Sequence, residues 1–142
     1  MTVISVDEGL RRRREAAIHA HLEAEAAGDP QAILATFAHP RYELIGGTGR
    51  AYEGPEQVLR YLVERRHAFP DLHTEIVALY HATDVVAAEL WLIGSHRGRL
   101  GDVDPSGKAF RCRVASFFEF RDAGLVGIRT YFDMASIARQ LA

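Results

Sequence analysis

Several features are scarce in this chain, and each shortage narrows the classes of protein to which it can belong. Cys112 is its one cysteine, so no disulfide can form within the chain, and this fits a reducing compartment. No apolar run approaches the ~20 residues that cross a membrane, and the first residues lack the apolar core of a secretory signal. We therefore expect a soluble, cytoplasmic protein that has no membrane partner.

The chain also has little excess of one charge sign over the other. The chain has 17 Lys and Arg against 19 Asp and Glu, which gives a formal net charge of −2. Nucleic-acid binding needs a basic face, so no nucleic-acid partner is expected. The one basic block, Arg11–Arg14, stands among glutamates such as Glu8 and Glu15. This pattern predicts a solvated helix face.

The chain of 142 residues is the size of one domain, and hydrophobic residues make up 48% of it. A core of this size buries roughly 68–70% of the unfolded surface. We find neither an internal repeat nor a change in composition that would mark a boundary. Residues 1–142 are therefore expected to form a single domain.

Hydrophobic spacing predicts helices early in the chain and strands late. Gly28-Asp29-Pro30 has the residues that stop one helix and start the next. The predicted helices are Asp7–Ala27, Gln31–Ala38, one that starts at Pro55 and ends before Phe69, and Met134–Ala142. The predicted strands are Arg41–Ile45, Leu72–Tyr80, Val85–Ser95, Phe110–Phe120 and Leu125–Asp133. Gly46–Gly54 is assigned to a glycine-rich loop, because it lacks the spacing of a phosphate-binding loop.

This order predicts an α+β fold, a cone-shaped curved antiparallel sheet with N-terminal helices that enclose an apolar pocket. Side chains alternate across a strand, so each strand offers two faces. In Phe110–Phe120 one set is nearly all apolar and includes Cys112, Val114 and Ser116, whereas the other carries three charges. We expect the apolar set to line the pocket.

Charged and aromatic residues then gather on the other side of the sheet. This predicted outer face includes Trp91, Phe117 and Tyr131, which makes it a plausible surface for a homodimer. The alternative is that the long first helix covers it.

Short sequence stretches, none specific by itself, occur in an order that resembles a known family. They are Phe69-Pro70-Asp71, Gly94 to Gly98, Pro105 to Lys108, Tyr131-Phe132-Asp133 and Arg139-Gln140-Leu141. The set, which spans nearly the whole chain, resembles the SnoaL-like branch of the nuclear transport factor 2-like superfamily. The resemblance implies a cone-shaped barrel with a deep apolar cavity, often dimeric, whose chemistry needs no metal or organic cofactor. Relatives include polyketide cyclases, isomerases, epoxide hydrolases, dehydratases and binding domains, so fold does not settle function.

When the functional residues of the family are carried over to this sequence by position, some are matched and others are not. Gly94-Ser95-His96 matches the stretch that supplies a pocket histidine in the cyclases. The position of their acid/base aspartate is Ser116, and a serine hydroxyl cannot replace a carboxylate as a proton shuttle. The catalytic triad of limonene-type epoxide hydrolases falls on Leu90, Leu92 and Thr130, so that activity is excluded.

His96 and Glu43 are the candidate catalytic residues. Histidine is the side chain that ordinarily changes charge near neutral pH, so His96 could act as a base, or it could be a solvated histidine at a loop edge. Glu43, desolvated in an apolar cone, could pair with His96 in place of the missing aspartate, or it could be a surface residue paired with Arg41. The candidate substrate-binding residues are Tyr42, Tyr52, Leu90, Leu92, Cys112, Val114, Ser116, Thr130 and Phe132.

The histidines do not show a zinc spacing and the chain has one cysteine, so no metal is expected. The resemblance implies that no cofactor is needed either. We expect a domain that binds a small, apolar, oxygenated molecule and transfers protons next to a carbonyl, in a cyclisation, isomerisation or dehydration. The alternative is a non-catalytic ligand-binding or dimerisation domain.

Overall fold

The computed structural model of the chain describes residues 7–47 and 49–142. Within these residues, none of the helices is both long and apolar enough to span a membrane. The helices are α1 (Glu8–Ala27), α2 (Pro30–Ala35), α3 (Gly54–Ala68) and α4 (Met134–Leu141). The strands are β1 (Arg41–Ile45), β2 (Arg50–Glu53), β3 (His73–His81), β4 (Val85–Ser95), β5 (Ala109–Arg121) and β6 (Gly124–Tyr131).

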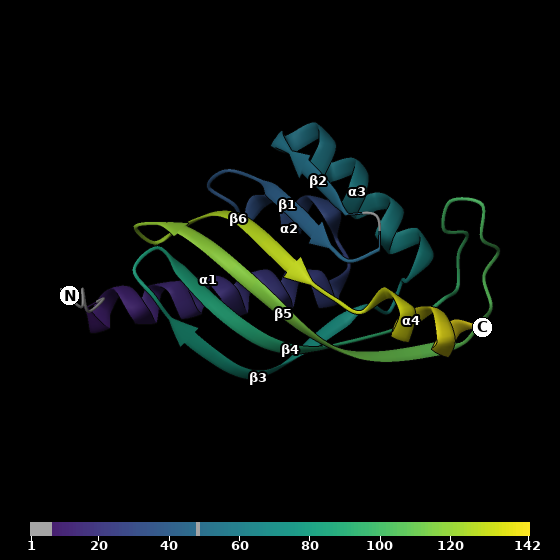
Figure 1. Cartoon of the computed structure of the whole chain (residues 1–142). Helices are drawn as coiled ribbons and strands as arrows, with labels where there is room; N and C mark the ends of the chain where they lie inside the picture. The colour runs from purple at the N-terminus through teal and green to yellow at the C-terminus, as the bar shows by residue number, and fades with distance from the viewer. Residues whose placement is uncertain (1–6, 48) are drawn as a thin grey trace.

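The strands form one curved, unclosed sheet in the order β2-β1-β6-β5-β4-β3 (Figure 1). The α+β prediction is confirmed, with two corrections. β1 pairs with β6 in parallel, whereas all other neighbours are antiparallel. The expected loop Gly46–Gly54 contains β2, because Arg50–Glu53 folds back on β1; Thr48 of that segment lies outside the described residues.

Aspartate side chains cap the first turns of α1, α2 and α4. The carboxylate of Asp7 accepts from the N–H of Leu10, and Asp29 and Asp133 cap α2 and α4 in the same way. At the end of α1, Gly28 adopts φ 73°, the left-handed conformation that glycine takes without strain. These caps confirm the predicted boundary between α1 and α2.

Helices α1 and α3 pack on one side of the sheet, and α4 packs against β5 (Figure 1). The core lies between α1–α3 and the sheet. Alternation along β5 holds as expected, because Cys112, Val114, Ser116, Phe118 and Phe120 are all buried. These side chains mark the concave face of the sheet, and the charged residues between them mark the outer face.

One member of the arginine run departs from the prediction. Arg11, Arg12 and Arg13 are exposed as expected, but Arg14 is only 2% exposed. Its guanidinium donates to the carbonyl oxygens of Asp122 and Thr83, both at 2.8 Å, and stacks on Phe120. Arg14 therefore ties α1 to the β3–β4 turn and the β5–β6 turn, which the sequence pattern of the helix alone does not reveal.

Candidate functional site

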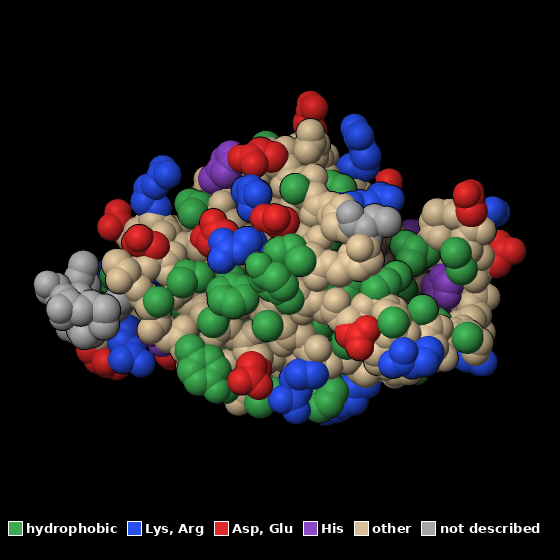
Figure 2. Space-filling model, in the orientation of Figure 1, with side chains coloured by type: hydrophobic (Ala, Val, Ile, Leu, Met, Phe, Trp, Pro, Cys, Tyr) green, Lys and Arg blue, Asp and Glu red, His purple; other side chains and the backbone are tan. Residues whose placement is uncertain are grey.

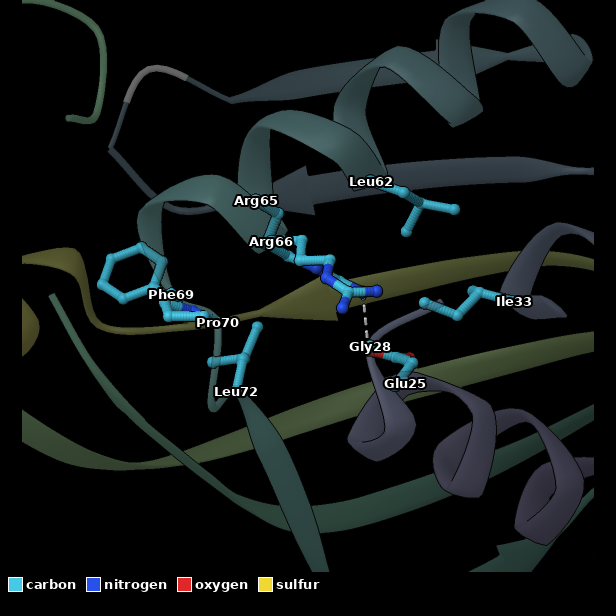
Figure 3. A pocket seen from close by; sticks show the side chains of 9 residues that line it. All are labelled: Glu25, Gly28, Ile33, Leu62, Arg65, Arg66, Phe69, Pro70 and Leu72. Carbon is cyan, nitrogen blue, oxygen red and sulfur yellow. Dashed lines mark hydrogen bonds and ion pairs between the residues drawn. The ribbon is translucent and has the colours of Figure 1, made fainter. Parts of the chain in front are cut away.

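A hollow that is open to solvent lies where the C-terminal ends of α1 and α3 approach the start of β3. Its empty volume is about 280 Å³, counting its solvent-open side. The apolar part of the wall includes Ile33, Leu62, Phe69 and Leu72 (Figure 3). The polar part comes from Glu25, Arg65 and Arg66. A small molecule in this hollow would meet apolar surface and charge together.

An ion pair between α1 and α3 forms the polar wall. Oε2 of Glu25 lies 2.8 Å from Nη2 of Arg65, and Oε1 lies 2.6 Å from Nε2 of His21 one turn earlier in α1. The guanidinium of Arg65 also lies over the rings of Tyr42 and Tyr61, at 5.7 and 5.2 Å. Both oxygens of Glu25 are therefore bound, one by Arg65 and the other by His21.

The partners of His21 assign a proton to Nδ1 of its ring. Thr36 donates its hydroxyl hydrogen to the carbonyl of Ile33 at 2.7 Å, so its oxygen accepts from Nδ1 of His21 at 2.6 Å. On the other side, Nε2 faces the Glu25 carboxylate and the Tyr42 hydroxyl, which lies 2.8 Å away. His21, which is fully buried, thus joins Thr36, Glu25 and Tyr42 behind the wall of the hollow.

The charges in this cluster shift the pKa values of its members. Burial alone would raise the pKa of Glu25, but Arg65 and His21 beside it lower that pKa to about 2. Burial raises the pKa of Tyr42, and the nearby Glu25 charge raises it further. Burial also raises the pKa of Tyr61. At neutral pH the cluster therefore consists of an ionised carboxylate and two protonated phenols.

His96 lies at the end of β4 and is 2% exposed. Its backbone pairs with Lys108, and the next two residues, Arg97 and Gly98, donate their N–H groups to the carbonyl of Ala68 in α3. A Cβ at position 98 would stand 2.0 Å from the His67 carbonyl oxygen, so only glycine allows this close approach. The segment that carries His96 is therefore fixed to the end of α3.

One ring nitrogen of His96 is hydrogen-bonded and the other is not. Nδ1 accepts from the N–H of Ser106 at 3.3 Å, which leaves the proton on Nε2. Nε2 is buried and has no hydrogen-bond partner among the described residues. The ring of Phe69, which also lines the hollow, lies against His96 with 5.4 Å between centroids. Phe69 is therefore a neighbour of both the hollow and His96.

The expected pairing of Glu43 with His96 is not formed. On β1 the residue before Glu43 is Tyr42, which is buried, so the side chain of Glu43 points to the outer face of the sheet. There it is about one-third exposed, and its carboxylate lies 3.2 Å from the guanidinium of Arg41. His96 follows the concave-side positions of β4. The two side chains lie on opposite sides of the sheet because they have opposite parity relative to its buried face.

The expected substrate-binding residues lie elsewhere than the hollow. Leu90, Cys112 and Val114 are buried in the core, and Leu92 and Phe132 pack against it. Tyr52 stacks on Tyr61 at 4.6 Å. None of the residues that line the hollow was among the candidates.

Ser116 and Thr130 face each other on neighbouring strands, on the concave side. Their hydroxyl oxygens lie 2.8 Å apart, so each has a partner within the protein. The position that holds an acid/base aspartate in the cyclases is therefore occupied by Ser116, whose hydroxyl bonds Thr130.

The His21–Glu25–Arg65 cluster was missed by sequence reasoning. One signal was present, because His21 shares the apolar face of α1 with Ile18, and Glu25 follows His21 by four residues. Arg65 could not have been assigned, since its contact with Glu25 joins two helices 40 residues apart. Among the residues that the structure describes, no group of three or more His, Cys, Asp and Glu side chains is placed to hold a metal ion.

Comparison with solved structures shows the same fold in bacterial proteins of low sequence identity. A SnoaL-like protein from Jannaschia sp. CCS1 is 16% identical with a TM-score of 0.81, and the match covers 97% of each chain. IdmH from Streptomyces antibioticus, named as a candidate polyketide cyclase, is 24% identical with a TM-score of 0.71, covering 90% of this chain and 97% of its own. A protein of ketosteroid isomerase-like fold from Catenulispora acidiphila, solved with trimethylamine, is 20% identical with a TM-score of 0.73, covering 88% and 91%.

A search of curated proteins gives no match. The family model of the SnoaL-like polyketide cyclases matches residues 16–141. This match runs from the middle of α1 to the last residue of α4 and includes both the ion-pair cluster and His96. The chain belongs to the SnoaL-like polyketide cyclase family.

Proposed function

We propose that the protein binds a small, largely apolar, oxygenated molecule on the concave side of the sheet and activates its carbonyl group without a cofactor. Enolisation next to that carbonyl would start a cyclisation, an isomerisation or a dehydration. The observation that carries this proposal is the buried Nε2–H of His96, which has no acceptor among the described residues.

A buried donor without an acceptor costs about 1–3 kcal/mol, and a ligand carbonyl oxygen would remove that cost. Nδ1 accepts from Ser106, so His96 presents its proton rather than its lone pair to the ligand. A donor aimed at a carbonyl stabilises the negative charge that develops on oxygen as the enolate forms. In this proposal His96 polarises the carbonyl, while a base from solution removes the proton on the neighbouring carbon.

In this proposal the ligand reaches His96 when the ring of Phe69 turns away. Phe69 is half-buried, lines the hollow and lies against both His96 and Phe110. A ligand that displaces this ring would extend from the hollow to the N–H of His96. Glu43 takes no part, because it faces the other side of the sheet.

A non-catalytic binding domain is the second candidate, and two observations favour it. Ser116 pairs with Thr130 at the position of the cyclase aspartate, so no carboxylate is supplied there. Glu25, which does face the hollow, has a pKa of about 2 and is therefore a weak base.

Exchange of carbon-bound hydrogen for deuterium distinguishes the two candidates. We would incubate 2-tetralone, an apolar ketone with acidic hydrogens, with the protein in D₂O and follow exchange by NMR. The wild type is expected to accelerate exchange and His96→Phe to lose that acceleration, whereas His96→Gln, which keeps an N–H donor, retains part of it. Binding without acceleration by the wild type would support the non-catalytic domain instead.

We also propose that two copies associate through the outer face of the sheet. Helices α1 and α3 leave that face uncovered, and Figure 2 shows apolar side chains among acidic and basic ones on it. Val77, Tyr80 and Tyr131 of strands β3 and β6 are 45%, 56% and 44% exposed. Exposed apolar side chains gathered on one face are typical of an interface.

Sedimentation velocity tests this association. The wild type is expected to sediment as a dimer and Tyr131→Glu as a monomer, because a charge would have to be buried in the interface. Val63→Glu, a matched change at a half-exposed residue of α3, should leave the dimer intact. A monomeric wild type, or equal effects of the two changes, would overturn the proposal.

A further inference from the structure

The hollow between α1, α3 and β3 carries more positive than negative charge. Of the residues that line it, Arg65 and Arg66 are cationic and Glu25 is anionic. Glu25 is already shared, because its two oxygens bind Arg65 and His21. Arg66 is exposed at the rim and has no ion-pair partner within residues 7–47 and 49–142. The free cation of the hollow is therefore the guanidinium of Arg66.

Inside the wall, the carboxylate of Glu25 faces the guanidinium of Arg65 and also bonds buried His21, so neither of its oxygens is left for Arg66. A surplus of one sign around a low-dielectric concavity selects a ligand group of the opposite sign. A guanidinium favours a carboxylate in particular, since it can bind both oxygens at once.

The apolar part of the wall determines which kind of molecule fits beside the two arginines. Ile33, Leu62, Phe69 and Leu72 supply apolar surface next to the two arginines, as Figure 3 shows. Leu72 in turn packs over Gly94, two residues before His96, so the apolar wall continues toward that histidine. A ligand seated here would have its anionic group at Arg66 and its apolar part against Phe69 and Leu72.

We propose that the ligand is a keto acid: an apolar molecule whose carboxylate binds Arg66 and whose ketone oxygen accepts from Nε2–H of His96. This inference rests on the proposed function, because it places the ligand carbonyl at His96. It adds a second recognition site, at the opposite end of the ligand, and thereby names the chemical class of the substrate.

Three related probes test it by isothermal titration calorimetry. They are 4-oxo-4-phenylbutanoate, its methyl ester, which lacks the charge, and 4-phenylbutanoate, which lacks the ketone. The wild type is expected to bind the keto acid about tenfold more tightly than the ester, as loss of a charge-assisted bidentate contact implies. In Arg66→Gln that ratio should fall to near one.

Two control variants locate the effect. Arg60→Gln removes the same charge from an exposed position of α3 outside the hollow, and should keep the tenfold preference. Arg66→Lys keeps the charge but loses the planar guanidinium. Its preference for the acid over the ester should lie between those of the wild type and Arg66→Gln. His96→Phe should weaken binding of the keto acid and the ester, but leave 4-phenylbutanoate unchanged.

Equal affinity of the wild type for acid and ester, or equal effects of the changes at positions 60 and 66, would overturn the inference. In that case, binding of the ester that still depends on His96 would leave the proposed function standing. If the wild type bound none of the three probes, both the inference and the proposed function would fail.

Discussion

The concave side and the outer face of the sheet both hold ion pairs, but in different surroundings. Under the helices, Glu25 is 11% exposed and Arg65 is 17% exposed, and the pair is joined to buried His21. On the outer face, Glu89 and Arg113 are 43% and 48% exposed. Water solvates the outer pair whether or not it forms, whereas the inner charges depend on each other. The same residue types therefore carry different energetic weight on the two sides.

Removal of one inner carboxylate should give the largest effect. Glu25→Ala leaves Arg65 buried without its counter-charge and His21 without its carboxylate partner, and breaking a buried pair costs about 3–5 kcal/mol. The matched outer change, Glu89→Ala, should cost about 1 kcal/mol or less, because that pair is exposed. Urea denaturation measures both free energies of unfolding. Equal losses would show that burial does not distinguish the two pairs.

Acid should weaken the inner pair over a defined pH range. The pKa of Glu25 is about 2 in the folded protein, below its ordinary value of 4.5. Glu25 therefore contributes stability above about pH 4.5 that is lost as the pH falls toward 2. At about 1.4 kcal/mol for each pKa unit, the loss is roughly 3 kcal/mol.

Comparison with Glu25→Gln isolates this contribution from other carboxylates, such as Asp71 and Glu53, whose pKa values are also lowered. The difference in unfolding free energy between wild type and variant should be constant from pH 7 to 5 and shrink below pH 4.5. A difference that stays constant down to pH 3 would contradict the assignment.

A smaller effect is expected from Arg14, a buried cation on the concave side that bonds only carbonyl oxygens. Arg14→Lys keeps the charge but cannot reach both Thr83 and Asp122, so it should lose one charge-assisted hydrogen bond, about 2 kcal/mol. Arg12→Lys, on the exposed side of α1, serves as control and should change the unfolding free energy by less than about 0.5 kcal/mol. Thermal unfolding of the two variants compares them directly.

The fold was predictable because its signals are local. Alternation along β5 separates Val114 and Phe118 from Arg113 and Glu119, and caps such as Asp29 mark helix boundaries. These patterns depend on residues that are close in the sequence. β2 was missed because it is short, follows glycines, and is a strand only through its pairing with β1.

The site was less predictable because its contacts are tertiary. Parity put His96 on the concave side, but the same rule, applied to Glu43 beside buried Tyr42, puts that carboxylate on the outer face. Arg65 is one of several charged residues in α3, and nothing in its neighbours indicates that it meets Glu25. Whether a charge is solvated or buried depended on helix packing that the sequence alone did not determine.

The parallel contact between β1 and β6 has a consequence for synthesis of the chain. Tyr42 of β1 must sit beside Ile128 of β6, which the ribosome adds much later. The antiparallel ribbon β3-β4-β5 can assemble from neighbours in the sequence, whereas the β1–β2 hairpin has no edge to join until β6 exists. A nascent chain that lacks β6 would therefore expose the edges of β1 and β5, which β6 joins in the complete sheet.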